Sequence, residues 1–342
     1  MTLRTSILYS VFFLAAFSAK AQNANILHYS ETSGYDHNTR ANSLAMFQTF
    51  PNVTVVNDET GASFDTLSYL LTFDLIVFSN TSGNAILDSL QRHNFEAYMQ
   101  NGGNLLGIHA ATDTYRHSTA NGNNTGVWDF YAKTIGGSVQ QSPNHVAGTP
   151  LYSIYKLNQH FTVAGLPDPW AKNEEYYYWE NGYLDSANQV VLNVEETVGP
   201  NGQVNSYDST RAVSWYKTTA NGNSIFYTSL GHGNSNFTTD SLFIQHIGQA
   251  TDWCLSRFVG LDENAEHLRV KLFPNPANEY VYFFSPTGNK QITIYTLSGK
   301  PVKHIAHLFG KQSLFIGDLA KGLYLVEITD DSHRQVEKLS VH

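Results

Sequence analysis

Short apolar runs alternate with amphipathic stretches along the first third of the chain. The apolar runs, typical of parallel strands buried on both faces, lie at 25–30, 53–56, 74–78 and 104–108. Helical spacing occurs at 39–50 and 86–100; the second stretch has Leu87, Leu90, Phe95 and Met99 as its expected inner side. Strands separated by helices predict an α/β fold with a mostly parallel sheet flanked by helices.

The pattern changes after residue 149. Strand-like runs follow at 151–156, 175–179, 190–194, 211–217 and 224–229, and Asn221-Gly222 is a strong hairpin signal. A helix is expected at 240–255, with Asp240 as its cap. We expect this half to extend the sheet with antiparallel strands and long loops.

Another change follows a charged connector at 259–267. Short alternating strands with glycine turns and no helix lie at 280–284, 291–297, 300–306, 312–316, 323–329 and 334–341. This pattern predicts an all-β, immunoglobulin-like sandwich. The expected divisions are a signal peptide at 1–21, an α/β domain at 22–257, a linker at 258–268 and the β domain at 269–342.

The first residues read as an export signal. Arg4 precedes an apolar stretch at 7–19, and Ala19-Lys20-Ala21 is a small-x-small cleavage site, so we expect the mature chain to begin at Gln22. The stretch is short for a membrane span, and no later run reaches the roughly 18 apolar residues that a transmembrane helix needs. We therefore expect an exported protein with no integral membrane segment after signal removal.

Composition narrows the classes of partner. The chain has 342 residues, a net charge of −9 and only 14% charged residues, so nothing basic is concentrated enough to follow a nucleic acid backbone. The single cysteine, Cys254, excludes an intramolecular disulfide and lies in an apolar helical run, where a buried, inert thiol is expected.

The main candidate for chemistry is Gly107-Ile-His-Ala-Ala111, directly after a buried strand. In α/β enzymes a tight strand-to-helix turn between small residues lifts one side chain above the carboxyl end of the sheet. Here that residue is His109, which can act as base, acid or metal ligand but makes covalent acyl transfer improbable. The alternative is a structural histidine at a tight turn.

Other candidates follow strands that end at the same edge of the sheet. His37 follows the first strand, and His232 follows the strand ending at Ser229. Asp113 follows the tight turn at 107–111 that carries His109, which we call the elbow. We expect His37, His109 and His232 to be candidate ligands of a divalent metal ion, with His109 and Asp113 as acid–base groups. Because no pair is fixed on one helix face, this spacing alone is nonspecific.

A stretch rich in aromatic residues and carboxylates adds further candidates. Glu175 is a candidate catalytic carboxylate, and Tyr176 and Trp179, together with Tyr35, are candidates for stacking on a sugar ring. The alternative is a strand whose aromatic residues pack in the core. His145 and His160 lie in polar loops and are expected to be surface histidines rather than ligands.

The last 75 or so residues resemble the C-terminal sorting domain of type IX secretion. The matching motifs are Phe273-Pro-Asn-Pro276, Ile294-Tyr-Thr-Leu-Ser-Gly299, Leu319-Ala-Lys-Gly-Leu-Tyr-Leu-Val326 and Lys338. This resemblance implies passage through the type IX secretion machinery and a secreted or surface-attached protein. An accessory immunoglobulin-like domain is the alternative.

Residues 25–256 resemble the ThuA-like (trehalose-utilisation) family. The resemblance rests on an ordered set of motifs: Gly34-Tyr-Asp-His37, 102–114 around the elbow, Phe130-Tyr131, His160 with Gly165-Leu-Pro167, Trp170, Glu174-Glu-Tyr176, Ala212-Val-Ser-Trp215 and 224–232. The sequence departs from the family's pattern in two places. A polar insertion at 115–126 lengthens the loop after the elbow, and Phe161 stands where the family usually has proline after the histidine. The family implies a flavodoxin-like fold, as in class I glutamine amidotransferases but without their cysteine, and a role with trehalose-like or oxidised sugars.

Three functional hypotheses follow. The first is a hydrolase, lyase or isomerase acting on a sugar or keto-sugar, with His109 at its centre and a divalent metal ion as a candidate cofactor. The second is a non-catalytic, cell-surface glycan-binding protein that uses the stretch around 176–179. The third, glutamine amidotransfer, fails because no cysteine stands at the elbow.

Overall fold

The computed structural model describes residues 23–116, 128–255, 270–329 and 334–342. The expected signal peptide, the whole of the expected linker and most of the polar insertion lie outside these ranges. No helix in the described ranges has the length and apolarity needed to span a bilayer.

The first domain is built on a nine-stranded sheet in the order β2-β1-β3-β4-β11-β10-β9-β6-β7. The first five of these strands are parallel to one another and the other four are antiparallel, as the pattern predicts. The strands are β1 (Ala24–Tyr29), β2 (Val53–Asp58), β3 (Leu75–Ser79), β4 (Leu105–Ile108), β6 (Leu151–Lys156), β7 (Trp170–Asn173), β9 (Gln189–Val194), β10 (Arg211–Thr218) and β11 (Ser224–Thr228). A separate two-stranded ribbon joins β5 (Gly137–Val139) to β8 (Trp179–Leu184).

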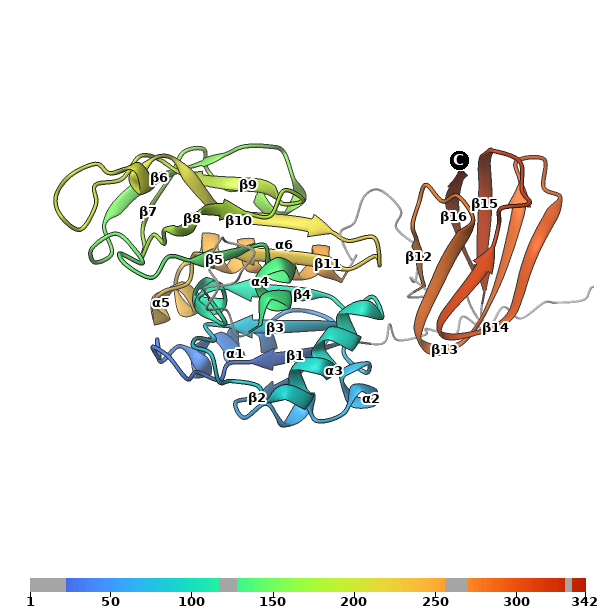
Figure 1. Ribbon diagram of the computed structural model, residues 1–342, viewed down its shortest axis with the longest axis horizontal. Coiled ribbons are helices and arrows are strands. Elements are labelled where there is room, and N and C mark those ends of the chain that lie inside the picture. The colour runs from blue at the N-terminus through green and yellow to red at the C-terminus, as the bar shows by residue number, and fades with distance from the viewer. Residues whose placement is uncertain (1–22, 117–127, 256–269, 330–333) are drawn as a thin grey trace, which may run out of the picture.

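Helices cover both faces of the sheet (Figure 1). One face carries α1 (Arg40–Gln48), α5 (Asn234–Thr238) and α6 (Ser241–Cys254), and the other carries α2 (Leu67–Leu70), α3 (Ser89–Gln100) and α4 (Asp129–Ile135). Short 3-10 turns lie at η1 (Ala62–Phe64), η2 (His109–Asp113), η4 (Phe161–Val163) and η5 (Ser206–Asp208). The mostly parallel α/β architecture is confirmed.

The core follows the alternation of side chains along the central strands. In β3, Leu75 and Val77 pack on the α6 side, whereas Ile76 and Phe78 pack on the α3 side. Because both faces are covered, every residue of β3 is buried, which explains its unbroken apolar run. Cys254 is a buried thiol outside any disulfide, and its Sγ lies 3.7 Å from the carbonyl oxygen of Leu105, as expected for an inert cysteine of the core.

Two local expectations are wrong. Leu90 is 60% exposed, because α3 begins at Ser89 behind the side-chain cap of Asp88 and its second residue faces outward. Of the expected strand at 175–179 only Trp179 lies in a strand, as the first residue of β8: residues 174–178 link β7 to β8 and pair with 144–146 only through an isolated bridge between His145 and Tyr177.

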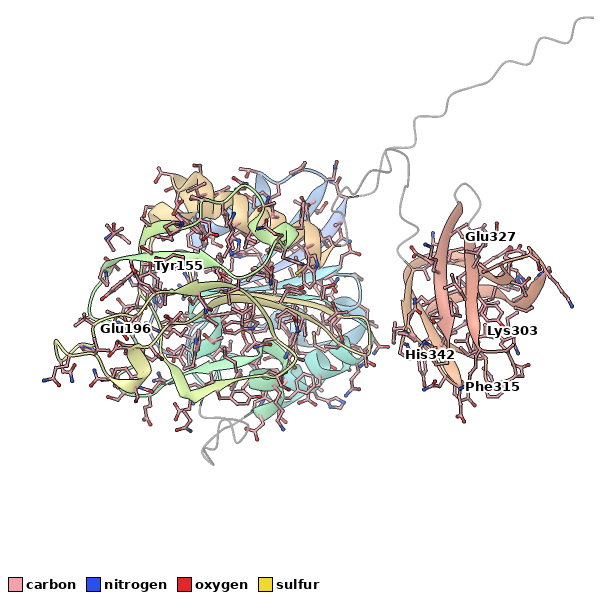
Figure 2. All side chains as sticks on the ribbon, turned by 90° about the horizontal axis from the view of Figure 1, so that it is seen from above. Tyr155, Glu196, Lys303, Phe315, Glu327 and His342 are labelled. Atoms are coloured by element: carbon pink, nitrogen blue, oxygen red, sulfur yellow. The ribbon has the colours of Figure 1, made fainter. Side chains whose placement is uncertain are left out.

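The C-terminal domain is all-β, as predicted. Its strands are β12 (Lys271–Phe273), β13 (Tyr280–Thr296), β14 (Pro301–Phe315), β15 (Gly322–Thr329) and β16 (Arg334–Val341). The expected strands at 280–284 and 291–297 join into β13, and those at 300–306 and 312–316 join into β14. The pairing of β13 with β14 shifts register between Ser285 and Ile292. Both halves of β13 supply residues to one hydrophobic core. Lys303, Phe315 and Glu327 mark this domain in Figure 2.

Candidate functional site

The turn after β4 has the strained geometry that the sequence predicts for an elbow. His109 has a φ of 48°, in the left-handed region that a non-glycine residue rarely adopts. The turn is closely packed: a Cβ on Gly107 would lie 2.6 Å from Ile135 Cδ1 and 3.3 Å from the Cβ of Ala111. Glycine before the elbow is therefore a steric requirement, and His109 is held, fully buried, at the carboxyl end of β4.

Hydrogen bonding defines which nitrogen of His109 is free. Nδ1 lies 2.6 Å from the carbonyl oxygen of Ser229, which can only accept, so Nδ1 carries the proton. In the neutral ring, Nε2 therefore presents a lone pair. The ring of Tyr177 stacks on this imidazole with centroids 4.6 Å apart, and its hydroxyl lies 2.9 Å from Nε2. Burial raises the pKa of Tyr177 well above its ordinary value, so its hydroxyl stays a proton donor.

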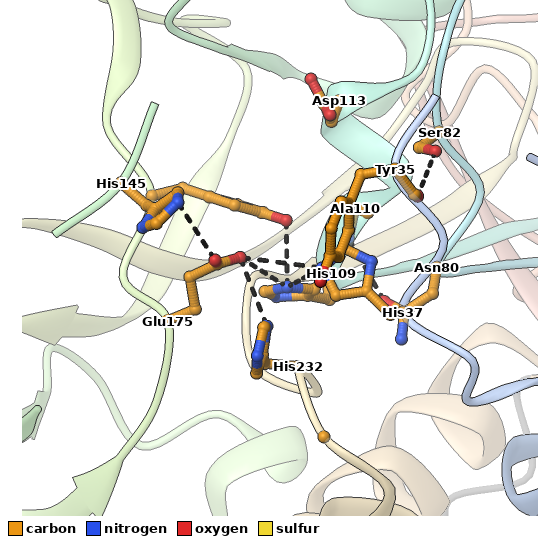
Figure 3. Close-up of polar contacts among 12 residues, drawn as sticks. Tyr35, His37, Asn80, Ser82, His109, Ala110, Asp113, His145, Glu175 and His232 are labelled. Atoms are coloured by element: carbon orange, nitrogen blue, oxygen red, sulfur yellow. Dashed lines mark hydrogen bonds and ion pairs between the residues drawn. The ribbon is translucent and has the colours of Figure 1, made fainter. Parts of the chain in front are cut away.

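Three side chains from distant parts of the chain, those of His37, Glu175 and His232, meet at this lone pair of His109 (Figure 3). Glu175 Oε2 lies 3.1 Å from His109 Nε2 and 3.7 Å from His37 Nε2. It also lies 3.4 Å from His232 Nδ1, and the Nε2 atoms of His109 and His37 are 3.2 Å apart. One ligand atom from each of the four residues lies within 4.8 Å of all the others.

Electrostatics in the cluster favour a positive charge at its centre. Burial alone would raise the pKa of Glu175, but its close contacts with the imidazoles of His109, His232 and His37 outweigh burial and hold this pKa far below its ordinary range. Hydrogen bonding to Glu175 raises the pKa of His232, whereas burial lowers the pKa of His37. An ionised carboxylate thus faces the nitrogens of three imidazoles, among them the lone pair of His109, an arrangement that a proton or a metal ion between them would stabilise.

The spacing of these atoms fits a small divalent cation. A tetrahedral ion with ligands at about 2.0–2.2 Å leaves those ligand atoms about 3.3–3.6 Å apart. Four of the six separations among the ligand atoms, at 3.1, 3.2, 3.4 and 3.7 Å, lie close to this range, and all six are within 4.8 Å. The donor set of three imidazoles and one carboxylate suits zinc and similar transition metals.

The carboxylate next to Glu175 anchors the loop that carries His232. Glu174 is 1% exposed and accepts hydrogen bonds from the backbone N–H groups of Gly231 (2.9 Å) and His232 (3.1 Å). It also accepts from Asn236 Nδ2 at 3.2 Å. Adjacent glutamates thus have different tasks: one fixes a loop, and the other faces the histidines.

Two further predicted residues lie at the edge of the cluster. Tyr35 is 67% exposed, and its ring centroid is 4.8 Å from that of His37. Asp113, the last residue of η2, pairs with Arg116 at 2.8 Å, and no hydrogen bond joins it to the histidines. Burial raises the pKa of Asp113 to about 6, against the opposing charge of Arg116.

The expected stacking surface at 176–179 is not available. Tyr176 is fully buried and donates to the carbonyl of Lys172, and Trp179 is 5% exposed and donates to the carbonyl of Ala212. Both rings belong to the hydrophobic core. Neither can offer a face to a sugar, so the core alternative holds for these two residues.

Two residues that sequence reasoning missed lie at the site. His145 Nε2 is 3.2 Å from Glu175 Oε1, and Tyr177 contacts His109 directly. His145 was expected to be a surface histidine; it reaches the site because 144–146 pairs with the segment around Tyr177. Since this pairing is not part of a regular strand, no periodicity in the sequence indicates it.

Comparisons with known proteins agree with this architecture. The sequence profile of the family described as trehalose utilisation (ThuA) matches residues 25–254, and that of a secretion system C-terminal sorting domain matches residues 271–342. The sorting domain indicates export by type IX secretion, to the medium or the outer surface. No curated protein matches the chain at a significant level.

Two solved structures share the fold of the first domain. A protein described as ThuA-like from Bacteroides uniformis has 21% identity and a TM-score of 0.55, covering 70% of this chain and 94% of its own. Another from Parabacteroides merdae has 14% identity and a TM-score of 0.51, covering 70% of this chain and 93% of its own. At these identities the likeness establishes the fold.

Proposed function

This chain belongs to the trehalose-utilisation (ThuA) family, and we propose that it is an exported enzyme acting on a sugar or keto-sugar through a divalent-cation centre. The proposed ligands are His37, His109, Glu175 and His232. The observation that carries the proposal is their convergence: four ligand atoms lie within 4.8 Å of one another, and the bond to Ser229 turns the lone pair of His109 toward the other three.

A bound cation would act as a Lewis acid on a carbonyl or hydroxyl oxygen of the substrate. The surrounding residues supply orientation and proton transfer. His145 holds the second oxygen of Glu175, which fixes the plane of the carboxylate. Tyr177 offers a hydroxyl at the centre of the cluster, and Asp113 is our candidate for acid–base chemistry at its edge.

The family supports a carbohydrate substrate, and the exposed ring of Tyr35 beside His37 is the remaining candidate for stacking on it. A purely glycan-binding protein is less well supported, because Tyr176 and Trp179 are buried. Glutamine amidotransfer lacks its nucleophile: the single cysteine, Cys254, is buried in α6.

The test begins with metal content. The mature protein should hold about one equivalent of a divalent cation by elemental analysis. H37Q, E175Q and H232Q should each weaken cation affinity more than about a hundredfold, which is more than the loss of a residue that only hydrogen-bonds to a metal ligand usually causes. H160Q is the matched control, because His160 is a half-buried histidine of the same domain that stacks on Tyr216 instead.

The second step is turnover. Protein stripped by a chelator and then given zinc, manganese or calcium is assayed on trehalose, other oligosaccharides and a keto-disaccharide, with products separated to distinguish hydrolysis, elimination and isomerisation. We expect turnover that depends on the cation and is lost in H232Q. Equal glycan binding by wild type and H232Q without turnover would favour a binding protein. Wild type that takes up no cation and is indifferent to chelator would overturn the proposal.

A further inference from the structure

A buried asparagine outside the proposed ligand set connects the loops that carry its histidines. Asn80 directly follows β3, is 4% exposed and has a φ of 51°. Figure 3 places it beside the elbow. Asparagine is one of the few residues with a side chain that occupies the left-handed region readily, so backbone and side chain together restrict this position.

The side chain of Asn80 bonds to three separate loops. Nδ2 donates to Thr39 Oγ1 at 2.7 Å and to the carbonyl oxygen of Gly231 at 3.0 Å. Oδ1 accepts from the backbone N–H of Ala110 at 3.3 Å. All three partners are buried or adjoin buried residues, so water cannot readily replace these bonds.

Each partner is a near neighbour of a proposed ligand. Thr39 lies two residues after His37, and Ala110 directly follows His109. Gly231 directly precedes His232. The side-chain amide of Asn80 thus links three segments that are distant in sequence: the β1–α1 loop, the elbow and the β11–α5 loop.

We propose that Asn80 is the positioning residue of this site: its amide sets the mutual spacing of His37, His109 and His232 and thereby the affinity for a cation. The inference builds on the proposed function, but the hydrogen bonds on which it rests do not depend on a bound ion. An amide is required, because a carboxylate would have no proton for the carbonyl of Gly231.

The same contact restricts the chemistry of the elbow. In α/β-hydrolases the backbone N–H after the elbow residue stabilises a developing oxyanion. Here that N–H, on Ala110, is directed at Asn80. The oxygen of a substrate therefore has to be stabilised by the cluster itself, which fits a cation-centred site better than acyl transfer.

Two variants of Asn80 test the proposal. N80G removes all three bonds and tolerates the left-handed backbone, whereas N80D keeps an acceptor for Ala110 and places a carboxylate against the Gly231 carbonyl. The matched controls are N104G and N104D. Asn104 is also 4% exposed and bridges two buried segments, donating to Asp74 and accepting from Ser224, at the other end of β4.

Two measurements separate positioning from general stability. The first is zinc affinity of the full mature chain, by competition with a chelating dye, beside its melting temperature. The second is the nitrogen NMR spectrum of the imidazoles in metal-free protein, which reports tautomer and environment for each ring. We expect N80G to bind zinc at least tenfold more weakly than N104G, and N80D to shift the signals of His232 more than those of His109.

The outcomes distinguish this inference from the proposed function. Zinc affinity and imidazole signals that change no more in the Asn80 variants than in the Asn104 variants would overturn the positioning role. Absence of binding of zinc, manganese and calcium by wild type would overturn the proposed function, and the imidazole spectra alone would then decide whether Asn80 orders the histidines.

Discussion

The backbone of His109 is held in a conformation that most side chains avoid. A left-handed residue other than glycine costs about 1–2 kcal/mol. The surroundings compensate: Nδ1 bonds to Ser229, and the hydroxyl of Tyr227 donates to the carbonyl oxygen of His109 at 2.8 Å. Backbone strain that the fold maintains at a buried histidine, where side chains from several loops meet, is typical of a functional position.

This strain predicts a difference between two substitutions at one position. H109A and H109G lose the same ring contacts, but only H109A keeps the cost of the left-handed backbone. We expect H109G to be more stable than H109A by about 1 kcal/mol in urea denaturation of metal-free protein. A111G, in the same turn at a residue without positive φ, should instead lower stability. Equal stability of H109A and H109G would show that the elbow relaxes.

Neutralising Glu174 and neutralising Glu175 should have different effects on the free energy of unfolding. In E174Q an amide would face the N–H donors of Gly231 and His232, so we expect a loss of about 1–3 kcal/mol of unfolding free energy. In E175Q the new amide can donate to the lone pair of His109, so metal-free protein at pH 8 should be unchanged or more stable. Urea titrations in chelator compare them, and an E175Q as unstable as E174Q contradicts the assignment.

At the scale of elements, β4 packs too tightly against α4 to accept a methyl group before the elbow. A Cβ on Gly107 would lie 2.6 Å from Ile135 Cδ1, and Ile135 is fully buried. We expect G107A to cost about 1–3 kcal/mol of unfolding free energy. I135V removes that Cδ1 and costs about 0.5–1.5 kcal/mol alone. In the double variant the costs should be less than additive; simple additivity would place the strain elsewhere.

Helix packing should also respond to pH through two buried histidines. His246 joins α6 to η4 by donating to the carbonyl oxygen of Thr162 at 2.7 Å, and His28 in β1 lies 2.9 Å from Ser43 of α1. Burial lowers the pKa of each from 6.5 to about 4. Between these values the unfolded chain binds more protons, so stability is complete above pH 6.5 and falls as the pH approaches 4, by up to about 3 kcal/mol per histidine.

The comparison that isolates this effect uses H246N, which cannot titrate. Urea denaturation at pH 7.5, 6 and 5 should show a smaller loss of stability in H246N than in wild type. Asp113 acts in the opposite direction, because burial raises its pKa to about 6 and the fold then binds its proton more readily. The difference between the two slopes, rather than either slope alone, is therefore the measurement. Identical slopes would mean that His246 is not neutral in the fold.

How much the sequence can predict differs between the parallel and antiparallel halves. The positions of His37, His109 and His232 were predictable, because each follows a strand of the parallel sheet and these strands end at one edge. The approach of His145 to Glu175 was not, since it depends on an irregular segment crossing the antiparallel half. Local periodicity carries no information about such a contact.

The alternation of apolar and polar residues along a segment also does not show which of its faces is covered by other parts of the protein. At 176–179 the aromatic residues fit either a sugar platform or a core, and the choice depends on the layers that pack against them. Tyr176 and Trp179 are buried on opposite sides of the sheet, in different core clusters. Only the assembled domain determines this, which is why the expected stacking surface was wrong while the strands around it were right.

At the scale of the whole molecule, the two domains have separate hydrophobic cores. The clusters on the two faces of the large sheet draw on residues from 26 to 255, and the third draws on residues from 270 to 341. No residue belongs to both sets. Because burial of apolar area is the main source of stability, separate cores favour separate folding units.

Separate cores predict two unfolding transitions, which the distribution of tryptophan makes measurable. The five tryptophans all lie in the first domain: Trp128, Trp170, Trp179, Trp215 and Trp253. Tryptophan emission therefore follows that domain alone, whereas far-ultraviolet circular dichroism follows both. The C-terminal domain is small, buries less surface and should unfold first and with a shallower dependence on urea.

Deletion of residues 271–342 gives the decisive comparison. We expect the truncated protein to lose the early phase of the dichroism curve while its tryptophan transition keeps the same midpoint. The sorting domain would then be an independent unit that can be removed after export without loosening the histidine cluster. A single transition seen by both probes in the full chain, moving to lower urea on truncation, would instead mean that the two cores stabilise each other.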